Sequence, residues 1–231
     1  MSRSVFYPIF IGFFMSASAS AAPIPATDFD SLSLGSRIVG PVGPDVEVSL
    51  IRTNGDSVGD LSSSVSCPAG VTECVPSANP YGTIYTYAHI VTPGVDMPND
   101  PPFPEPVTVV DFDGVELFEL GFEAYGFNGV AGYDFSEADL AGVNFSIDQG
   151  ASGSLAWIAD GQGWGTGEAI TFFWQSTQAP AGPGGLYSIS NPTGSGAGAG
   201  PVPVATVVPE PLMPTLLITG LAAMALRRMI G

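Results

Sequence analysis

The chain offers few residues for acid–base catalysis. His89 is the only histidine among 231 residues, so a Ser-His-Asp triad would have to use it as the general base. It lies at the end of a tyrosine-rich run, residues 85–89. We therefore interpret His89 as a strand histidine in an ordinary hydrogen-bonded role, and we assign no catalytic residue.

Carboxylates are the second source of possible chemistry. Asp113, Glu116, Glu119 and Glu123 lie close together in the sequence, and a pair of such groups can cleave a glycosidic bond. A general acid also needs a raised pKa, which depends on burial and neighbours that a sequence does not reveal. We interpret these residues as solvated strand edges and keep a secreted polysaccharide hydrolase as the alternative function.

Two turn regions carry oxygen ligands of the kind that calcium prefers. Asp56 and Asp60 follow Asn54, while Asp111 and Asp113 belong to a D-F-D-G run. Hard cations favour such oxygen-rich turns, although neither stretch matches an EF-hand loop. No cofactor is expected, and these four aspartates are the candidate ligands for calcium.

An aromatic platform for sugar binding is a further candidate site. Trp164 lies in a glycine-rich run, residues 161–165, where a loop would leave the indole free to stack on a sugar ring. Trp157 and Trp174 lie in apolar, strand-like runs and are predicted to belong to the core. Trp164 is therefore the predicted glycan contact.

Cys67 and Cys74 are the only cysteines. In an exported chain, two cysteines most commonly form a disulfide, and the short loop between these two would gain about 2 kcal/mol from it. A metal-binding pair is the alternative, in which only His89 could assist. The sequence favours the disulfide.

The secondary-structure elements that position these residues are predicted to be short β-strands. Alternating or β-branched and aromatic composition marks eight candidate strands, namely residues 45–51, 83–91, 107–112, 115–122, 143–148, 154–159, 169–175 and 186–190. The two around Asp113-Gly114 are predicted to form a hairpin, and residues 136–140 a single helical turn capped by Ser136. With frequent Gly and Pro turns, this pattern predicts an all-β fold, an antiparallel β-sandwich of the jelly-roll kind.

The body of the chain is strongly acidic. Residues 23–207 contain two cations, Arg37 and Arg52, and 21 of the 22 acidic residues, because only Glu210 lies outside this range. The formal charge of the body is therefore −19. Nucleic acids and anionic membrane surfaces would find no basic patch and are not expected as partners. Solvation of an extracellular surface accounts for this charge.

The N-terminus has the three parts of a secretory signal peptide. Arg3 precedes an apolar run, residues 5–15, and a stretch of small residues, 16–22. Two overlapping A-x-A patterns place cleavage after Ala19 or Ala21. Residues 1–21 are therefore predicted to be a signal peptide and residues 22–190 an ectodomain outside the inner membrane. A membrane anchor is the alternative, because the positive region is thin.

The C-terminus combines a motif, an apolar run and a basic pair. Val208-Pro209-Glu210-Pro211 precedes residues 212–226, which carry no charge, and Arg227-Arg228 follows. As a helix, the apolar run would span about 22 Å, against a hydrocarbon core of about 30 Å. We expect a transmembrane helix with both arginines at the cytoplasmic face. Before the motif, residues 191–207 are rich in Gly, Ala and Pro and predict a flexible linker.

This arrangement closely resembles the PEP-CTERM sorting domain of exported proteins in Gram-negative bacteria that make exopolysaccharide. The resemblance covers residues 208–231. It implies recognition by exosortase, a membrane-bound enzyme that removes the tail and supplies the catalytic residues itself. A plain C-terminal anchor and a buried core helix are the alternatives.

The resemblance also implies a location and a role. The protein would be anchored briefly in the inner membrane, then released or attached to the cell surface, the exopolysaccharide or the biofilm matrix. The expected function is a non-enzymatic surface or matrix component that is structural or glycan-binding.

Overall fold

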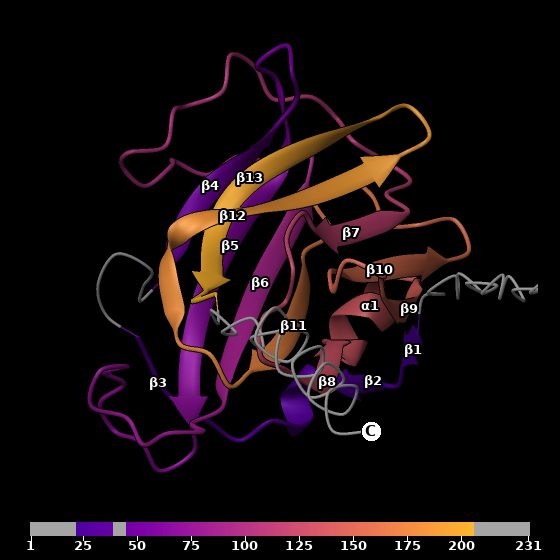
Figure 1. Ribbon diagram of the computed structural model, residues 1–231. Helices are drawn as coiled ribbons and strands as arrows, with labels where there is room; N and C mark the ends of the chain where they lie inside the picture. The colour runs from indigo at the N-terminus through magenta and orange to yellow at the C-terminus, as the bar shows by residue number, and fades with distance from the viewer. Residues whose placement is uncertain (1–21, 39–44, 206–231) are drawn as a thin grey trace, which may run out of the picture.

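The computed structural model describes residues 22–38 and 45–205, which form an all-β body with one short α-helix (Figure 1). The elements in chain order are β1 Ala22–Ile24, β2 Ala26–Asp28, the 3-10 turn η1 Phe29–Ser31, β3 Leu34–Arg37, β4 Val46–Ile51, β5 Ser57–Pro68, β6 Tyr85–Pro93, β7 Leu117–Leu120, β8 Phe127–Tyr133, α1 Phe135–Ala141, β9 Asn144–Gln149, β10 Leu155–Asp160, β11 Ile170–Ser176, β12 Pro180–Asn191 and β13 Gly194–Pro203. The prediction of an all-β, mostly antiparallel fold is confirmed.

The strands pair into a single sheet that returns to the segment where it starts. The order is β1-β9-β10-β7-β12-β13-β4-β5-β6-β11-β8-β2, with β3 paired to β5 at the side. Among these strands only β2 and β8 run parallel. The two ends of this path, β1 and β2, flank Pro25 in one N-terminal segment. Because proline has no backbone N–H to donate to a ladder, the segment breaks there and each half pairs with a different end of the sheet.

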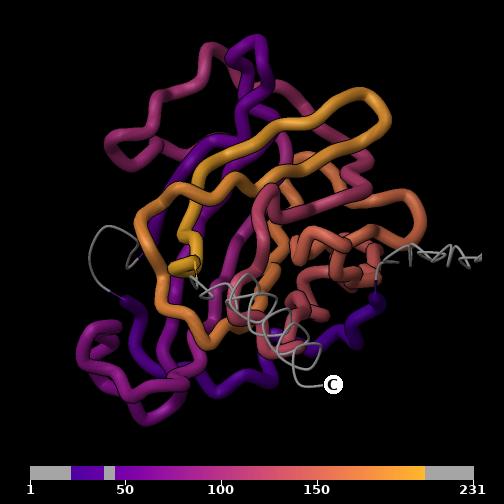
Figure 2. The backbone as a smooth tube through the Cα atoms, viewed as in Figure 1, coloured from indigo at the N-terminus to yellow at the C-terminus, as the bar shows by residue number. Residues whose placement is uncertain are grey.

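The sheet folds over on itself and encloses an aromatic core. Phe118 of β7 and Phe172 of β11 are separated by five intervening strands in sheet order, yet their ring centroids lie 4.7 Å apart. Tyr187 of β12 lies 4.2 Å from His89 of β6 in the same way. Figures 1 and 2 show β12 and β13 crossing over β5 and β6. The two facing layers are therefore parts of one continuous hydrogen-bonded sheet.

The predicted hairpin around Asp113-Gly114 is wrong. β7 pairs with β10 and β12, while residues 107–112 contribute only an isolated bridge between Val109 and Ser57. Gly114 does turn the chain, with φ of 64°, but the turn sets Val115 against Trp164. Gly114 therefore provides the local bend that the sequence indicated, but the strands that pair with β7 come from distant parts of the chain.

The flexible linker predicted at residues 191–207 is wrong over most of its length. Residues 194–203 form β13, which pairs along β12 and meets β4 where Ala197 lies opposite Ile51. The buried glycines of β13 alternate with less buried small residues. A Cβ on Gly196 would lie 2.8 Å from the carbonyl oxygen of Leu50, so glycine allows this close approach. The folded body extends to Pro203 rather than ending at residue 190.

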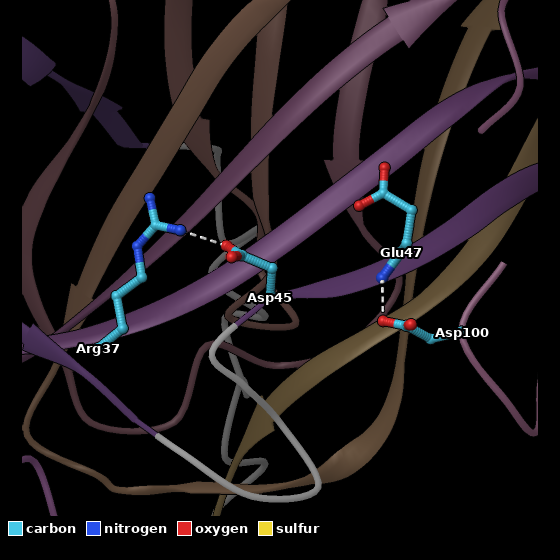
Figure 3. Close-up of polar contacts among 4 residues, drawn as sticks. All are labelled: Arg37, Asp45, Glu47 and Asp100. Carbon is cyan, nitrogen blue, oxygen red and sulfur yellow. Dashed lines mark hydrogen bonds and ion pairs between the residues drawn. The ribbon is translucent and has the colours of Figure 1, made fainter. Parts of the chain in front are cut away.

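The segment between β6 and β7 covers much of the open edge of β4. The backbone N–H of Glu47 donates to Asp100 Oδ2 at 3.0 Å, and the N–H of Ser49 donates to Asn99 Oδ1 at 2.7 Å. Figure 3 shows the first of these contacts. Side chains thus satisfy backbone donors that a neighbouring strand would otherwise pair, which protects the edge from pairing with another chain.

The predicted helical turn is confirmed as the longer helix α1. Its N-cap is Asp134, whose carboxylate accepts the N–H of Glu137 at 2.9 Å, rather than Ser136. Gly142 ends the helix in the left-handed region. Among the residues that the structure describes, no helix has the length and apolar character needed to span a membrane. The predicted transmembrane helix, residues 212–226, and the signal peptide, residues 1–21, lie outside those residues.

Candidate functional site

His89 and Ser63 form a fully buried pair between β5 and β6. Ser63 Oγ lies 2.9 Å from His89 Nδ1, and the rings of Tyr187 and Phe118 enclose the imidazole. Burial lowers the pKa of His89 to about 3, so the ring is neutral near pH 7. A substrate would have no access to this pair, which agrees with the prediction of a hydrogen-bonded strand histidine.

Trp164 is buried rather than displayed. Its side chain is 1% exposed and packs against Phe145 and Phe172, with ring centroids 5.2 and 5.6 Å away. Backbone pairing with Val115 folds the glycine-rich loop onto the body and draws the indole into the core. The predicted glycan contact at Trp164 is therefore wrong. The predicted core positions of Trp157 and Trp174 are confirmed.

The four aspartates predicted as calcium ligands are not brought together. Asp56 is hydrogen bonded within the β4–β5 turn, and Asp113 accepts the N–H of Thr166 at 2.9 Å. Asp60 is buried in β5, and Asp111 is exposed. Across residues 22–38 and 45–205, no group of three or more His, Cys, Asp or Glu side chains is placed to hold a metal ion. Hydrogen bonds from neighbouring groups, Thr108 for Asp56 and Thr166 for Asp113, account for the positions of these two side chains.

The acidic residues between positions 113 and 123 lie on β7 and on either side of it. Glu119 lies on β7 and accepts a hydrogen bond from Ser188 at 3.3 Å. Glu116 and Glu123 are exposed on either side of that strand. Glu116 and Glu123 therefore occupy solvated positions, as predicted, whereas Glu119 is half-buried on a strand that is paired on both sides.

A different carboxyl group, Asp60, is buried beneath the segment that follows β6. Its side chain is 5% exposed, and Oδ1 accepts the N–H of Met97 at 3.1 Å. Burial, together with the neighbouring carboxylates of Glu47 and Asp96, raises the pKa of Asp60 to about 8. Sequence reasoning placed Asp60 on a turn and missed this environment.

Cys67 and Cys74 form a disulfide, as predicted. The bond closes the loop that follows β5, and Cys74 also bridges to Ile38. Disulfides persist in oxidising compartments and are rare in the cytosol.

An open pocket of about 350 Å³ lies between the β4–β5 turn and the β12–β13 turn, lined by residues 52–54 and 193–195. Both turns lie towards the top of the view in Figure 1. The Arg52 guanidinium lies over the Phe112 ring, with Cζ 5.2 Å from the ring centroid. Its Nε is buried and has no hydrogen-bond partner among the described residues. Sequence reasoning did not single out this pocket, although Arg52 is one of only two cations in the body.

The other cation, Arg37, is paired. It forms an ion pair with Asp45 near the start of β4 (Figure 3). Within residues 22–38 and 45–205, Arg52 forms no such ion pair. The two arginines therefore differ in how much of their hydrogen-bonding capacity is already used.

The sorting motif Val208-Pro209-Glu210-Pro211 and the basic pair Arg227-Arg228 lie outside the described residues. No protein-family model matches the chain, and no curated protein or solved structure shows significant similarity to it.

Proposed function

We propose that this protein is an exported cell-surface or exopolysaccharide-matrix component of a Gram-negative bacterium, sorted and processed through a PEP-CTERM tail. The observation that carries the proposal is a sequence arrangement in residues 208–231, where a short motif is followed by an apolar run and then by an arginine pair. At the other end of the chain, residues 1–21 have the pattern of a signal peptide. The disulfide in the body supports it, because such bonds persist in the periplasm and outside the cell.

In this proposal the tail crosses the inner membrane once, with Arg227 and Arg228 on the cytoplasmic side. Exosortase recognises the motif at residues 208–211 and removes the apolar segment. The jelly-roll-like, sandwich-type body stays outside the inner membrane and is released or attached to the surface or the exopolymer. There it acts as a structural or glycan-binding component. Burial of His89 and Asp60 favours this role over a secreted polysaccharide hydrolase.

Intact-mass analysis of the mature protein from its native host tests the proposal. The expected mass lacks both the signal peptide and residues 212–231. Replacing Pro209-Glu210-Pro211 by alanines should leave the tail attached and hold the protein at the membrane.

The chain supplies a matched control, since the same tripeptide occurs in the body at Pro104-Glu105-Pro106. Alanines at those positions should leave tail removal unchanged. A mature wild-type protein that still carries residues 212–231 would reject processing by exosortase.

A further inference from the structure

We propose that the pocket around Arg52 binds the carboxylate of a uronic-acid residue in an acidic polysaccharide. The inference deepens the glycan-binding role proposed above and rests on it for its biological setting. Three features of the pocket support it, namely the fixed position of the arginine, its unused donors and the polar pocket walls.

Arg52 is held in place before any ligand arrives. Its backbone N–H donates to the carbonyl oxygen of Asp56 at 2.8 Å, and its guanidinium lies over Phe112. Gly194 lies alongside, since a Cβ there would be 3.8 Å from both Nε and Nη2. A guanidinium positioned in this way loses little rotational freedom on binding, which favours affinity.

The donors of this guanidinium are not used within the described residues. Arg52 forms no ion pair there, and its buried Nε has no acceptor. The carboxylate nearest to it along the chain is engaged elsewhere, because Asp56 accepts hydrogen bonds from Asn54 and Thr108. The buried Nε is out of a ligand's reach, so the terminal Nη groups are the donors that an acceptor in the pocket would meet.

The pocket walls indicate what kind of acceptor fits. The planar fork of a guanidinium matches a carboxylate with two parallel hydrogen bonds. Thr53 and Ser195 add hydroxyl groups, and within the described residues the lining contains no carboxylate and no aliphatic or aromatic side chain. Such walls suit the hydroxyls of a sugar ring better than the alkyl part of an acidic peptide. A volume of about 350 Å³ lies at the lower end of the range for small-ligand sites, which suits one or two rings.

The charge of the body makes the inference specific. At −19, the field around the body repels polyanions at long range, so a uronate chain can bind only through local contacts. Salt screens that repulsion. Affinity should therefore hold or rise from low to physiological salt, opposite to the behaviour of a polycationic binder.

The test is a calorimetric titration of the mature protein with trigalacturonate, with its neutral methyl ester as the comparison ligand. Wild-type protein should bind the acid and not the ester. Arg52→Gln should weaken binding about tenfold or more, because it removes the charge and the fork. Arg52→Lys keeps the charge but not the fork and should weaken binding several-fold. Arg37→Gln, which makes the same change of charge at the ion-paired arginine, should bind like the wild type.

Several results would overturn the inference. They are absence of binding by the wild type, equal affinity for the methyl ester, and equal or tighter binding of triglutamate. Binding that chelation of divalent cations abolishes and the Arg52 variants leave unchanged would overturn it too, since a bridging cation would then hold the ligand. If Arg52→Gln does not fold, as its thermal unfolding will show, Arg52→Lys decides. Failure here leaves the processing of the tail untouched, because that is measured by mass in the native host.

Discussion

At the scale of single residues, His89 and Asp60 give the protein opposing responses to pH. Burial lowers the pKa of His89 from 6.5 to about 3, so the unfolded chain binds more protons between these values and stability falls as the pH drops through that window. Burial and nearby carboxylates raise the pKa of Asp60 from 3.8 to about 8. There the folded protein binds more protons, so stability is highest below about pH 4 and falls as the pH rises towards about 8.

Replacing Asp60 should isolate its part of this balance. We expect Asp60→Asn to raise the free energy of unfolding at pH 7 by about 1 kcal/mol, because the amide still accepts the N–H of Met97 and never has to be buried charged or take up a proton. Urea unfolding of the mature protein from pH 4 to pH 8 measures the effect, with the exposed Asp111→Asn as control. An unchanged pH slope in Asp60→Asn would contradict the raised pKa.

The Ser63–His89 pair lends itself to a double-mutant cycle. His89→Leu alone should destabilise the protein by about 1 to 3 kcal/mol, because it leaves the buried hydroxyl of Ser63 without its partner. Adding Ser63→Ala should recover much of that loss, since both buried positions are then apolar. Chemical denaturation of the two single variants and the double variant gives the coupling energy. Strictly additive losses would show that the two side chains act independently.

At the scale of elements, the strands with their own pattern were predictable and those that depend on distant partners were not. Residues 45–51 and 169–175 were predicted within a residue or so of β4 and β11, because alternation or dense aromatic composition marks each segment by itself. The serine-rich β5 and the glycine-rich β13 lack that composition. They are strands because they lie between partners, β4 and β6 for one and β12 and β4 for the other.

The same reasoning explains the outcome at the candidate sites. The Cys67–Cys74 disulfide was predictable because its loop is local. Trp164 was misjudged because its burial depends on Val115, far away in the sequence. The Arg52 pocket was not predicted for a similar reason, since its two walls come from turns that lie far apart in the sequence, residues 52–54 and 193–195. The one sequence signal was the scarcity of cations.

A glycine substitution tests whether β13 is a packed strand in solution. In Gly196→Ala, the new Cβ would lie 2.3 Å from Val58 Cγ2 and 2.8 Å from the carbonyl oxygen of Leu50. We expect a loss of about 1 to 3 kcal/mol from this overpacking. Gly182→Ala on β12 is the matched control, because no atom outside its chain neighbours lies within 4 Å of the new Cβ. Equal thermal unfolding midpoints for the two variants would argue for the flexible linker instead.

At the scale of the whole molecule, the folded body ends only a few residues before the proposed processing motif, because β13 occupies most of the predicted linker. β13 ends at Pro203, and the N–H of Val204 still donates to the carbonyl oxygen of Ala179 at 2.9 Å. From Val204 to Val208 the chain can span at most about 14 Å. Under the proposed function, the folded body therefore lies beside the membrane surface when exosortase acts, and it limits the space in which the enzyme can reach the motif.

Changing the length of this connection should change the rate of tail removal. Deleting residues 205–207 should slow removal in a pulse-chase experiment, because the body would then occupy the space that the enzyme needs. Inserting a Gly/Ser segment after Val207 should keep or increase the rate, since a flexible chain lengthens the reach without adding structure. Formation of the Cys67–Cys74 disulfide in each variant controls for folding of the body. Removal at the wild-type rate after the deletion would mean that the enzyme engages the motif from the side of the apolar segment, where the body does not interfere.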